Sequence, residues 1–189
     1  MSLIPEFKIG LWNAWIFTTY LFLFVPLYFL THLKDRDAQE QFFPEDGEKI
    51  DSLQNSGRAF VFVYPVFLPL KTGTLWFTIG LPVIIIGMVL YASVYVTMLR
   101  TPLDKPLTTG IYRFSRHPGH VTPYIVFLGI SIACASWLFF VNATAFIIMH
   151  CITAIPEERH DLERYGDAYK NYAHRTPRWL GIPKYRLEK

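Results

Sequence analysis

Long uncharged runs alternate with charged segments along this chain, and this alternation defines its predicted elements. Residues 9–30 form one uninterrupted uncharged run, and residues 74–99 form a second. A helix needs about 20 apolar residues to cross the ~30 Å hydrocarbon core of a membrane, so each run predicts one spanning helix. The apolar segment 59–70 is shorter and contains two prolines, which leaves it either a kinked crossing or a re-entrant segment.

A longer stretch follows, because no Asp, Glu, Lys or Arg occurs from His117 to Pro156. Its apolar part, residues 121–155, is too long for a single crossing. The small, weakly helical patch at 133–136 predicts a turn between two shorter helices. The pattern therefore predicts an all-α fold, a polytopic membrane helix bundle of about five transmembrane helices.

The distribution of lysine and arginine selects among the possible topologies. If all five segments cross, one side of the membrane holds 16 of these residues and the other side holds only Lys8 and Lys71. A re-entrant second segment gives a division of 13 to 5, which fits the positive-inside rule less well. We therefore predict an integral, multi-pass membrane protein with an external N-terminus and a cytosolic C-terminal tail.

Composition supports a membrane protein and excludes other classes. Hydrophobic residues make up 52% of the chain and the mean hydropathy is +0.25, which is too apolar for an ordinary soluble domain of this length. The net charge of +3 is small and follows no nucleic-acid-binding motif, so no nucleic acid partner is expected. Cys134 and Cys151 match no metal-ligand spacing, and no metal site is predicted.

The C-terminal tail has an amphipathic pattern of its own. Four apolar residues recur at steps of three and four, namely Leu162, Tyr165, Tyr169 and Tyr172. This spacing predicts a cytosolic helix with one aromatic stripe, which lies along the membrane surface or folds back onto the bundle. Gly166 within it predicts a close backbone approach, and Pro177 ends the pattern.

The polar ends of the long uncharged stretch carry the candidate chemistry. A helical hairpin that enters the membrane after His120 and then returns brings Arg116 and His117 beside Glu157 and Glu158 on the cytosolic face. An arginine can bind a carboxylate or phosphate with two hydrogen bonds, and the glutamates can accept from an ammonium group or from ribose hydroxyls. The cluster therefore predicts a zwitterionic ligand held beside an apolar wall.

Each of these residues also has a simpler structural interpretation. Arg113 and Arg116 can anchor a helix end among lipid headgroups, and the paired glutamates can complement a helix dipole. His117 can cap its loop, and His150 can be a hydrogen-bonded residue of the bundle. Four aromatic residues fit an interfacial belt, namely Tyr112, Trp76, Trp137 and Trp179.

The combination of segments is more specific than its parts. The order "GIYRFSRHP", an uncharged helical hairpin and "EERHDLERYGDAYKNYAHRTPRW" resembles the C-terminal half of the integral-membrane methyltransferases typified by isoprenylcysteine carboxyl methyltransferase and the phospholipid N-methyltransferases. The resemblance covers residues 110–178, and the matching positions are Gly110, Tyr112, Arg116, His117, Pro118, Glu157, Glu158, Leu162, Gly166, Tyr169 and Tyr172. His120 stands where that family usually has tyrosine and Thr122 where it usually has glycine.

The resemblance implies an enzyme that transfers a methyl group from S-adenosylmethionine to a lipophilic or membrane-associated acceptor at the cytosolic face. It implies cofactor binding by Tyr112, Arg116, His117, Pro118, Glu157 and Glu158, and places Arg116, Glu158 and His120 at the reaction. It divides the chain into N-terminal transmembrane helices with a cytosolic connector, residues 1–100, and a cofactor-binding region, residues 101–189.

The acceptor and two other classes of function stay open from the sequence. A prenylated cysteine, a phospholipid amine, an isoprenoid and a thiol all suit a site that faces lipid. An NADPH-dependent membrane reductase of the sterol or steroid type shares a comparable arginine, histidine and tyrosine stretch, but it lacks the paired glutamates and the tyrosine tail. A non-catalytic membrane subunit leaves the clustering of the polar residues unexplained.

Overall fold

The computed structural model describes residues 8–32, 60–102 and 104–183, with the side chains of residues 24–32 and of Thr153 outside that description. Within these residues the chain forms α1 (Trp15–His32), η2 (Tyr64–Phe67), α4 (Leu75–Arg100), η3 (Gly110–Arg113), α5 (Pro118–Ala133), α6 (Trp137–Tyr165) and α7 (Asp167–Arg175). The predicted all-α class is confirmed for this part of the chain.

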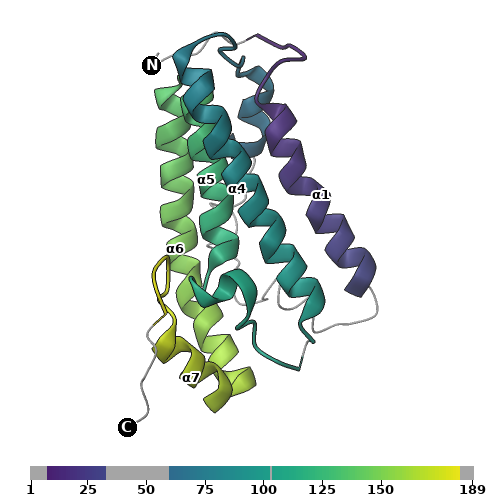
Figure 1. Ribbon diagram of the computed structural model, residues 1–189, viewed down its shortest axis with the longest axis vertical. Coiled ribbons are helices and arrows are strands. Elements are labelled where there is room, and N and C mark those ends of the chain that lie inside the picture. The colour runs from purple at the N-terminus through teal and green to yellow at the C-terminus, as the bar shows by residue number, and fades with distance from the viewer. Residues whose placement is uncertain (1–7, 33–59, 103, 184–189) are drawn as a thin grey trace.

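The long helices lie side by side and share one polar end. In Figure 1, α1, α4, α5 and α6 run along the long axis of the molecule, α4 and α6 in one direction and α5 in the other. The short helix α7 lies across the end at which α4 and α6 finish and α5 begins. The loop before α5, the end of α6 and the C-terminal tail therefore meet, as the predicted helical hairpin requires.

Two helices of the described residues, α4 and α6, are long and apolar enough to cross a membrane. The helix α5 is apolar but shorter, with 16 residues. The uncharged part of α6 is residues 137–155, about 28 Å long at a rise of ~1.5 Å per residue, which is close to the ~30 Å thickness of a hydrocarbon core. Which side of the membrane each end of the helix bundle faces stays a prediction.

The third predicted crossing, residues 59–70, begins outside the described residues. From residue 60 it shows eight helical residues, ending with η2, which span at most ~16 Å and so only half of the hydrocarbon core. The chain then pairs with the segment before α1, where the backbone N–H of Ala14 donates to the carbonyl of Leu68 at 2.9 Å. Five crossings therefore stay a prediction.

The predicted turn between two helices at 133–136 is confirmed. Helix α5 ends at Ala133, and Ala135 has a φ of 51° where the chain reverses. Ser136 caps α6, because its hydroxyl accepts a hydrogen bond from the backbone N–H of Phe139 at 3.2 Å. This turn makes α5 and α6 an antiparallel pair whose open end is the polar end of the bundle.

Three glycines set the distance between α4 and α5, and we call this contact the α4–α5 seam. A Cβ at Gly129 would lie 2.7 Å from the backbone nitrogen of Ile84, and one at Gly80 would lie 2.5 Å from the backbone nitrogen of Ala133. Gly87 is equally close to Val126. Small residues let membrane helices approach closely, so the seam fixes where α5 begins and therefore where its first polar residues lie.

Candidate functional site

The loop that leads into α5 is held against α4 by a glycine. Gly110 has a φ of 58°, and a Cβ at this position would lie 2.5 Å from the hydroxyl oxygen of Thr97 on α4. Both the backbone angle and the lack of space require glycine here. The following turn, η3, places Tyr112 in a buried hydrophobic cluster that includes Val94 of α4.

The first turn of α5 explains the Arg-His-Pro sequence. Pro118 occupies the first helical turn, where a missing backbone N–H leaves no intrahelical hydrogen bond unmade. Thr122, where the resemblance leads us to expect glycine, is buried and donates its hydroxyl to the carbonyl of Pro118 at 2.9 Å. The backbone is therefore helical at Thr122, and His117 precedes the helix as its N-cap residue with its side chain buried.

Residues 177–181 lie along the loop before α5, and we call them the tail strap. The backbone N–H of Arg116 donates to the carbonyl of Pro177 at 3.0 Å, and that of Gly181 donates to the carbonyl of Phe114 at 3.0 Å. Such backbone pairing holds the strap in register with the loop. It brings the side chains of the strap to the polar end of α5 and α6.

Glu158 is the centre of charge at this end. Its side chain is only 12% exposed. Arg178 of the tail strap donates hydrogen bonds to both of its oxygens, from Nε to Oε1 at 2.9 Å and from Nη2 to Oε2 at 2.6 Å. Arg116 Nη1 lies 3.1 Å from Oε1, and His117 Nε2 lies 3.0 Å from the same oxygen. Three cationic or donor groups from two other segments therefore converge on one carboxylate of α6.

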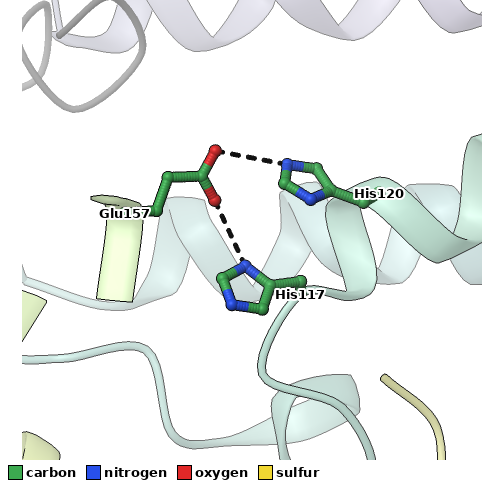
Figure 2. A group of neighbouring side chains, drawn as sticks. All are labelled: His117, His120 and Glu157. Atoms are coloured by element: carbon green, nitrogen blue, oxygen red, sulfur yellow. Dashed lines mark ion pairs between the residues drawn. The ribbon is translucent and has the colours of Figure 1, made fainter. Parts of the chain in front are cut away.

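Glu157 contacts the two histidines at the start of α5. Its Oε2 lies 3.2 Å from His117 Nδ1, and its Oε1 lies 3.4 Å from His120 Nε2, as Figure 2 shows. His117 therefore has a carboxylate at each ring nitrogen. The ring of His120 lies 5.0 Å from that of His150, which is placed deeper in α6, within its uncharged part.

We call this group the polar end cluster, and its members are Arg116, His117, His120, Glu157, Glu158 and Arg178. Burial alone would raise the pKa of the Glu157 carboxyl, but hydrogen bonding and charge from the two histidines outweigh it and lower the pKa to about 2. In the same way Arg178, His117 and Arg116 together lower the pKa of Glu158 against the effect of burial. Both carboxylates are therefore ionised at neutral pH.

Two predictions for the tail were wrong, the separate helix and the close approach at Gly166. Instead of starting a separate tail helix, α6 continues to Tyr165, and Gly166 with φ 55° and ψ −129° breaks the helix before α7. A Cβ at Gly166 would meet no atom within 4 Å, so the predicted close approach is absent and the backbone angles are what require glycine. The aromatic stripe is divided, since Tyr169 and Tyr172 are buried while Leu162 is 45% exposed.

Tyrosines of α7 hold that helix against the loop before α5. The hydroxyl of Tyr172 donates to the carbonyl of Tyr112 at 2.7 Å, and Tyr169 completes a buried cluster with both. Helix α7 ends at Arg175, two residues before Pro177, which confirms the predicted stop. Tyr112 therefore helps to hold α7 against the loop that carries Arg116 and His117. Its predicted role as a wall of the ligand pocket stays a prediction.

The sequence missed one member of the cluster. Arg178 follows Pro177, which predicts extended chain after α7 on the same side as the two glutamates, and this was the signal that could have found it. Trp179, assigned by the sequence to an interfacial belt, has its ring 5.6 Å from that of His117. The structure brings together the predicted residues Arg116, His117, His120, Glu157 and Glu158, although their roles stay predictions.

Comparison with known proteins identifies one family. The sequence model of the family described as phospholipid methyltransferase matches residues 72–168, just over half of the chain. The match contains α4, α5 and α6 with the loop between α4 and α5, whereas the tail strap lies beyond it. Among curated proteins, none matches the chain.

Proposed function

The chain belongs to the phospholipid methyltransferase family, and on this basis we propose that it transfers a methyl group from S-adenosylmethionine to a lipophilic acceptor at the cytosolic face of a membrane. The family consists of methyltransferases, and its description names a lipid. The methyl donor, the acceptor and the side of the membrane are parts of the proposal.

One observation carries the proposal. Within the matched region, the guanidinium of Arg116 is only 15% exposed, and its buried Nε has no hydrogen-bond partner among the described residues. A buried donor without a partner costs roughly 1–3 kcal/mol, so its presence beside two ionised carboxylates favours a ligand that completes it. An amino acid group, with a carboxylate and an ammonium a few bonds apart, has the matching charges.

The polar end cluster fits such a donor. In this proposal Arg116 Nε donates to a ligand carboxylate, and the oxygens of Glu157 and Glu158 accept from an ammonium group or from ribose hydroxyls. When bound, S-adenosylmethionine supplies a methyl group on a sulfonium, which an acceptor displaces in line. The task of the chain is then to align the two molecules and to exclude water, which weakens a nucleophile by solvating it.

The acceptor approaches, in this proposal, from the side of His120. This residue lies in the first turn of α5, between the Glu157 carboxylate and His150 in the uncharged part of α6. We assign Arg116 and Glu158 to the donor and His120 to the acceptor. The region from residue 101 onward contains all of these residues, and we propose it as the cofactor-binding region.

Isothermal titration of the detergent-purified protein with S-adenosylhomocysteine and with NADPH tests the proposal. We expect S-adenosylhomocysteine to bind, and Arg116→Ala to weaken it by about 10-fold to 150-fold, because a charge-assisted hydrogen bond is worth roughly 1.5–3 kcal/mol. Arg113→Ala is the matched control, since this exposed arginine lies three residues away and outside the cluster.

Two results would contradict the proposal. Binding of NADPH without any response to S-adenosylhomocysteine would assign the chain to reductase chemistry instead. Equal affinities in Arg116→Ala and Arg113→Ala would show that Arg116 serves only as a helix anchor among headgroups.

The proposed topology has its own test. Lys71 lies at the end of the bundle opposite the polar end cluster, where its backbone N–H donates to the carbonyl of Ala133 at 3.2 Å, and Lys170 lies on α7. Single cysteines introduced at these two positions, in a background lacking Cys134 and Cys151, are expected to react with an impermeant thiol reagent from opposite sides of the membrane. Reaction of both from one side would overturn the topology.

A further inference from the structure

Donor atoms of His117, His120 and Glu157 lie close together. One ligand atom from each of these side chains lies within 4.8 Å of the others, and they come from the N-cap and the first turn of α5 and from α6. Figure 2 shows the Glu157 carboxylate facing both imidazole rings, with one oxygen directed at each. His117 is the N-cap residue of α5 and His120 lies in its first turn, so both side chains lie at the same end of this helix.

The distances between these atoms fit a bound metal ion. Ligand atoms about 2.0–2.2 Å from a tetrahedral zinc ion lie roughly 3.3–3.5 Å from one another. The Glu157 oxygens lie 3.2 Å from His117 Nδ1 and 3.4 Å from His120 Nε2. Each histidine therefore already lies at a ligand-to-ligand distance from one oxygen of Glu157, and the three ligand atoms together lie within 4.8 Å of one another.

We propose that His117, His120 and Glu157 bind one divalent transition-metal ion. The environment of His117 supports the assignment. Both ring nitrogens of His117 face a carboxylate, Nδ1 that of Glu157 and Nε2 that of Glu158. A metal ion bound at Nδ1 leaves Nε2 free to donate a hydrogen bond to Glu158.

Glu158 has the position of an outer carboxylate in such a site. Metal-bound histidines usually donate their second ring N–H to a carboxylate or carbonyl, which fixes the tautomer and the ring orientation. His117 Nε2 lies 3.0 Å from Glu158 Oε1, and Glu158 is itself held by Arg178 and Arg116. The histidine ring is therefore oriented by a chain of contacts that runs to the tail strap.

The donor set defines the class of ion. Two imidazole nitrogens and one carboxylate oxygen suit zinc and its transition-metal neighbours, whereas magnesium and calcium prefer oxygen ligands alone. Three protein ligands leave a fourth tetrahedral position open to an exchangeable molecule. His120 is decisive, because the tyrosine that the resemblance leads us to expect at this position would supply no imidazole.

This inference goes beyond the proposed function, since in-line methyl transfer to an acceptor needs no metal. The two remain compatible, because an ionised carboxylate offers about four lone-pair sites. A glutamate that ligates an ion can still accept a hydrogen bond from a second molecule. His120, assigned above to the acceptor, meets Glu157 through Nε2 and keeps Nδ1 without a partner among the described residues. The test must therefore measure the metal and the methyl-donor analogue separately.

Zinc titration of the full chain, purified without a polyhistidine tag and stripped with a chelator, tests the site. We expect one equivalent of Zn²⁺ per chain by calorimetry and by elemental analysis, no binding of Mg²⁺, and a zinc shell containing two imidazoles by X-ray absorption. His120→Tyr and Glu157→Gln should each weaken zinc by roughly 100-fold or more, because loss of an outer partner alone costs about 10-fold to 100-fold.

His160→Gln is the matched control, because this exposed histidine lies on the same end of α6 outside the group, and it should leave zinc affinity unchanged. Less than half an equivalent of zinc in the wild type, or equal affinity in His120→Tyr and wild type, would overturn the inference. S-adenosylhomocysteine affinity of the stripped protein is measured in parallel. Intact analogue binding with no zinc binding would refute the metal site and leave the proposed function standing.

Discussion

Along the α4–α5 seam, glycines bring two neighbouring helices into backbone contact, whereas the polar end cluster joins side chains from segments that lie far apart in the sequence. At the seam, Gly129 on α5 faces Ile84 on α4, and the contact depends on the absence of atoms. At the cluster, Glu158 contacts Arg116 and Arg178, and the contact depends on matched charges. The seam fixes where the helices lie, and the cluster determines what can bind at their end.

The largest effect is expected from removing the carboxylate at the centre of the cluster. Glu158→Ala leaves Arg116 and His117 with no counter-charge from Glu158, in surroundings where their side chains are 15% and 6% exposed. Breaking a buried ion pair costs about 3–5 kcal/mol, and we expect about 3 kcal/mol because Arg178, at 41% exposed, can turn towards water. Thermal unfolding in detergent measures the loss, and limited proteolysis should show a released tail strap.

Glu163→Ala is the matched control for this experiment. Glu163 lies on the same helix and pairs with Arg159, but the two side chains are 68% and 82% exposed. Such a surface pair contributes about 0.3–0.5 kcal/mol, so the control should barely change the melting temperature. Similar losses in the two variants would mean that burial does not distinguish the cluster from an ordinary surface pair.

The burial of the charges in the cluster is also the feature that the sequence did not predict. The length of the uncharged stretch and the small residues near Ser136 were enough to predict the hairpin that joins Arg116 to Glu158. The same reasoning leaves Arg116 open to a role as an exposed anchor among headgroups, because a sequence does not show that a segment after Pro177 returns to cover it. The structure places Arg178 there through backbone pairing of the strap with the loop.

The glycines show a second limit of the sequence. Two positions require glycine for different reasons. At Gly166 the reason is a positive φ, with open space around the residue, and at Gly129 it is the backbone of the neighbouring helix. A pattern of hydrophobic spacing does not distinguish these two reasons, so the predicted close approach at Gly166 was wrong. Only the path of α4 and α5 reveals which glycines form the seam.

A smaller but clear effect is expected from filling the seam. Gly129→Ala adds a Cβ that would lie 2.7 Å from the backbone nitrogen of Ile84 and 3.1 Å from the carbonyl oxygen of Gly80. Because backbone atoms cannot move aside as a flexible side chain can, we expect a loss of about 2 kcal/mol, within the ~1–3 kcal/mol range for overpacking. Thermal unfolding in detergent measures it.

Gly119→Ala provides a control with the opposite sign. It lies in the same helix, but a Cβ there has its nearest neighbour, a side-chain carbon of Val94, at 4.0 Å. Alanine should be neutral or stabilise α5 by roughly 0.5–1 kcal/mol, since glycine loses more conformational freedom on folding. Destabilisation of both variants by the same amount would show that the seam is not closer than the rest of α5.

The smallest effect is expected at the support of the cluster, where Tyr172 joins α7 to the loop before α5. Tyr172→Phe keeps the buried ring and removes a hydroxyl that donates to the carbonyl of Tyr112 at 2.7 Å. We expect a loss of about 1 kcal/mol, because the net value of one hydrogen bond is roughly 0.5–1.5 kcal/mol. Lys170→Ala on the exposed face of α7 serves as the control and should change little.

Amide hydrogen exchange distinguishes the two regions more sharply, since residues 110–117 should exchange faster in Tyr172→Phe while α4 and α5 keep their protection. If the seam loosened together with this loop, the two regions would form one cooperative unit, and the distinction between a packed seam and a separately held polar end would fail.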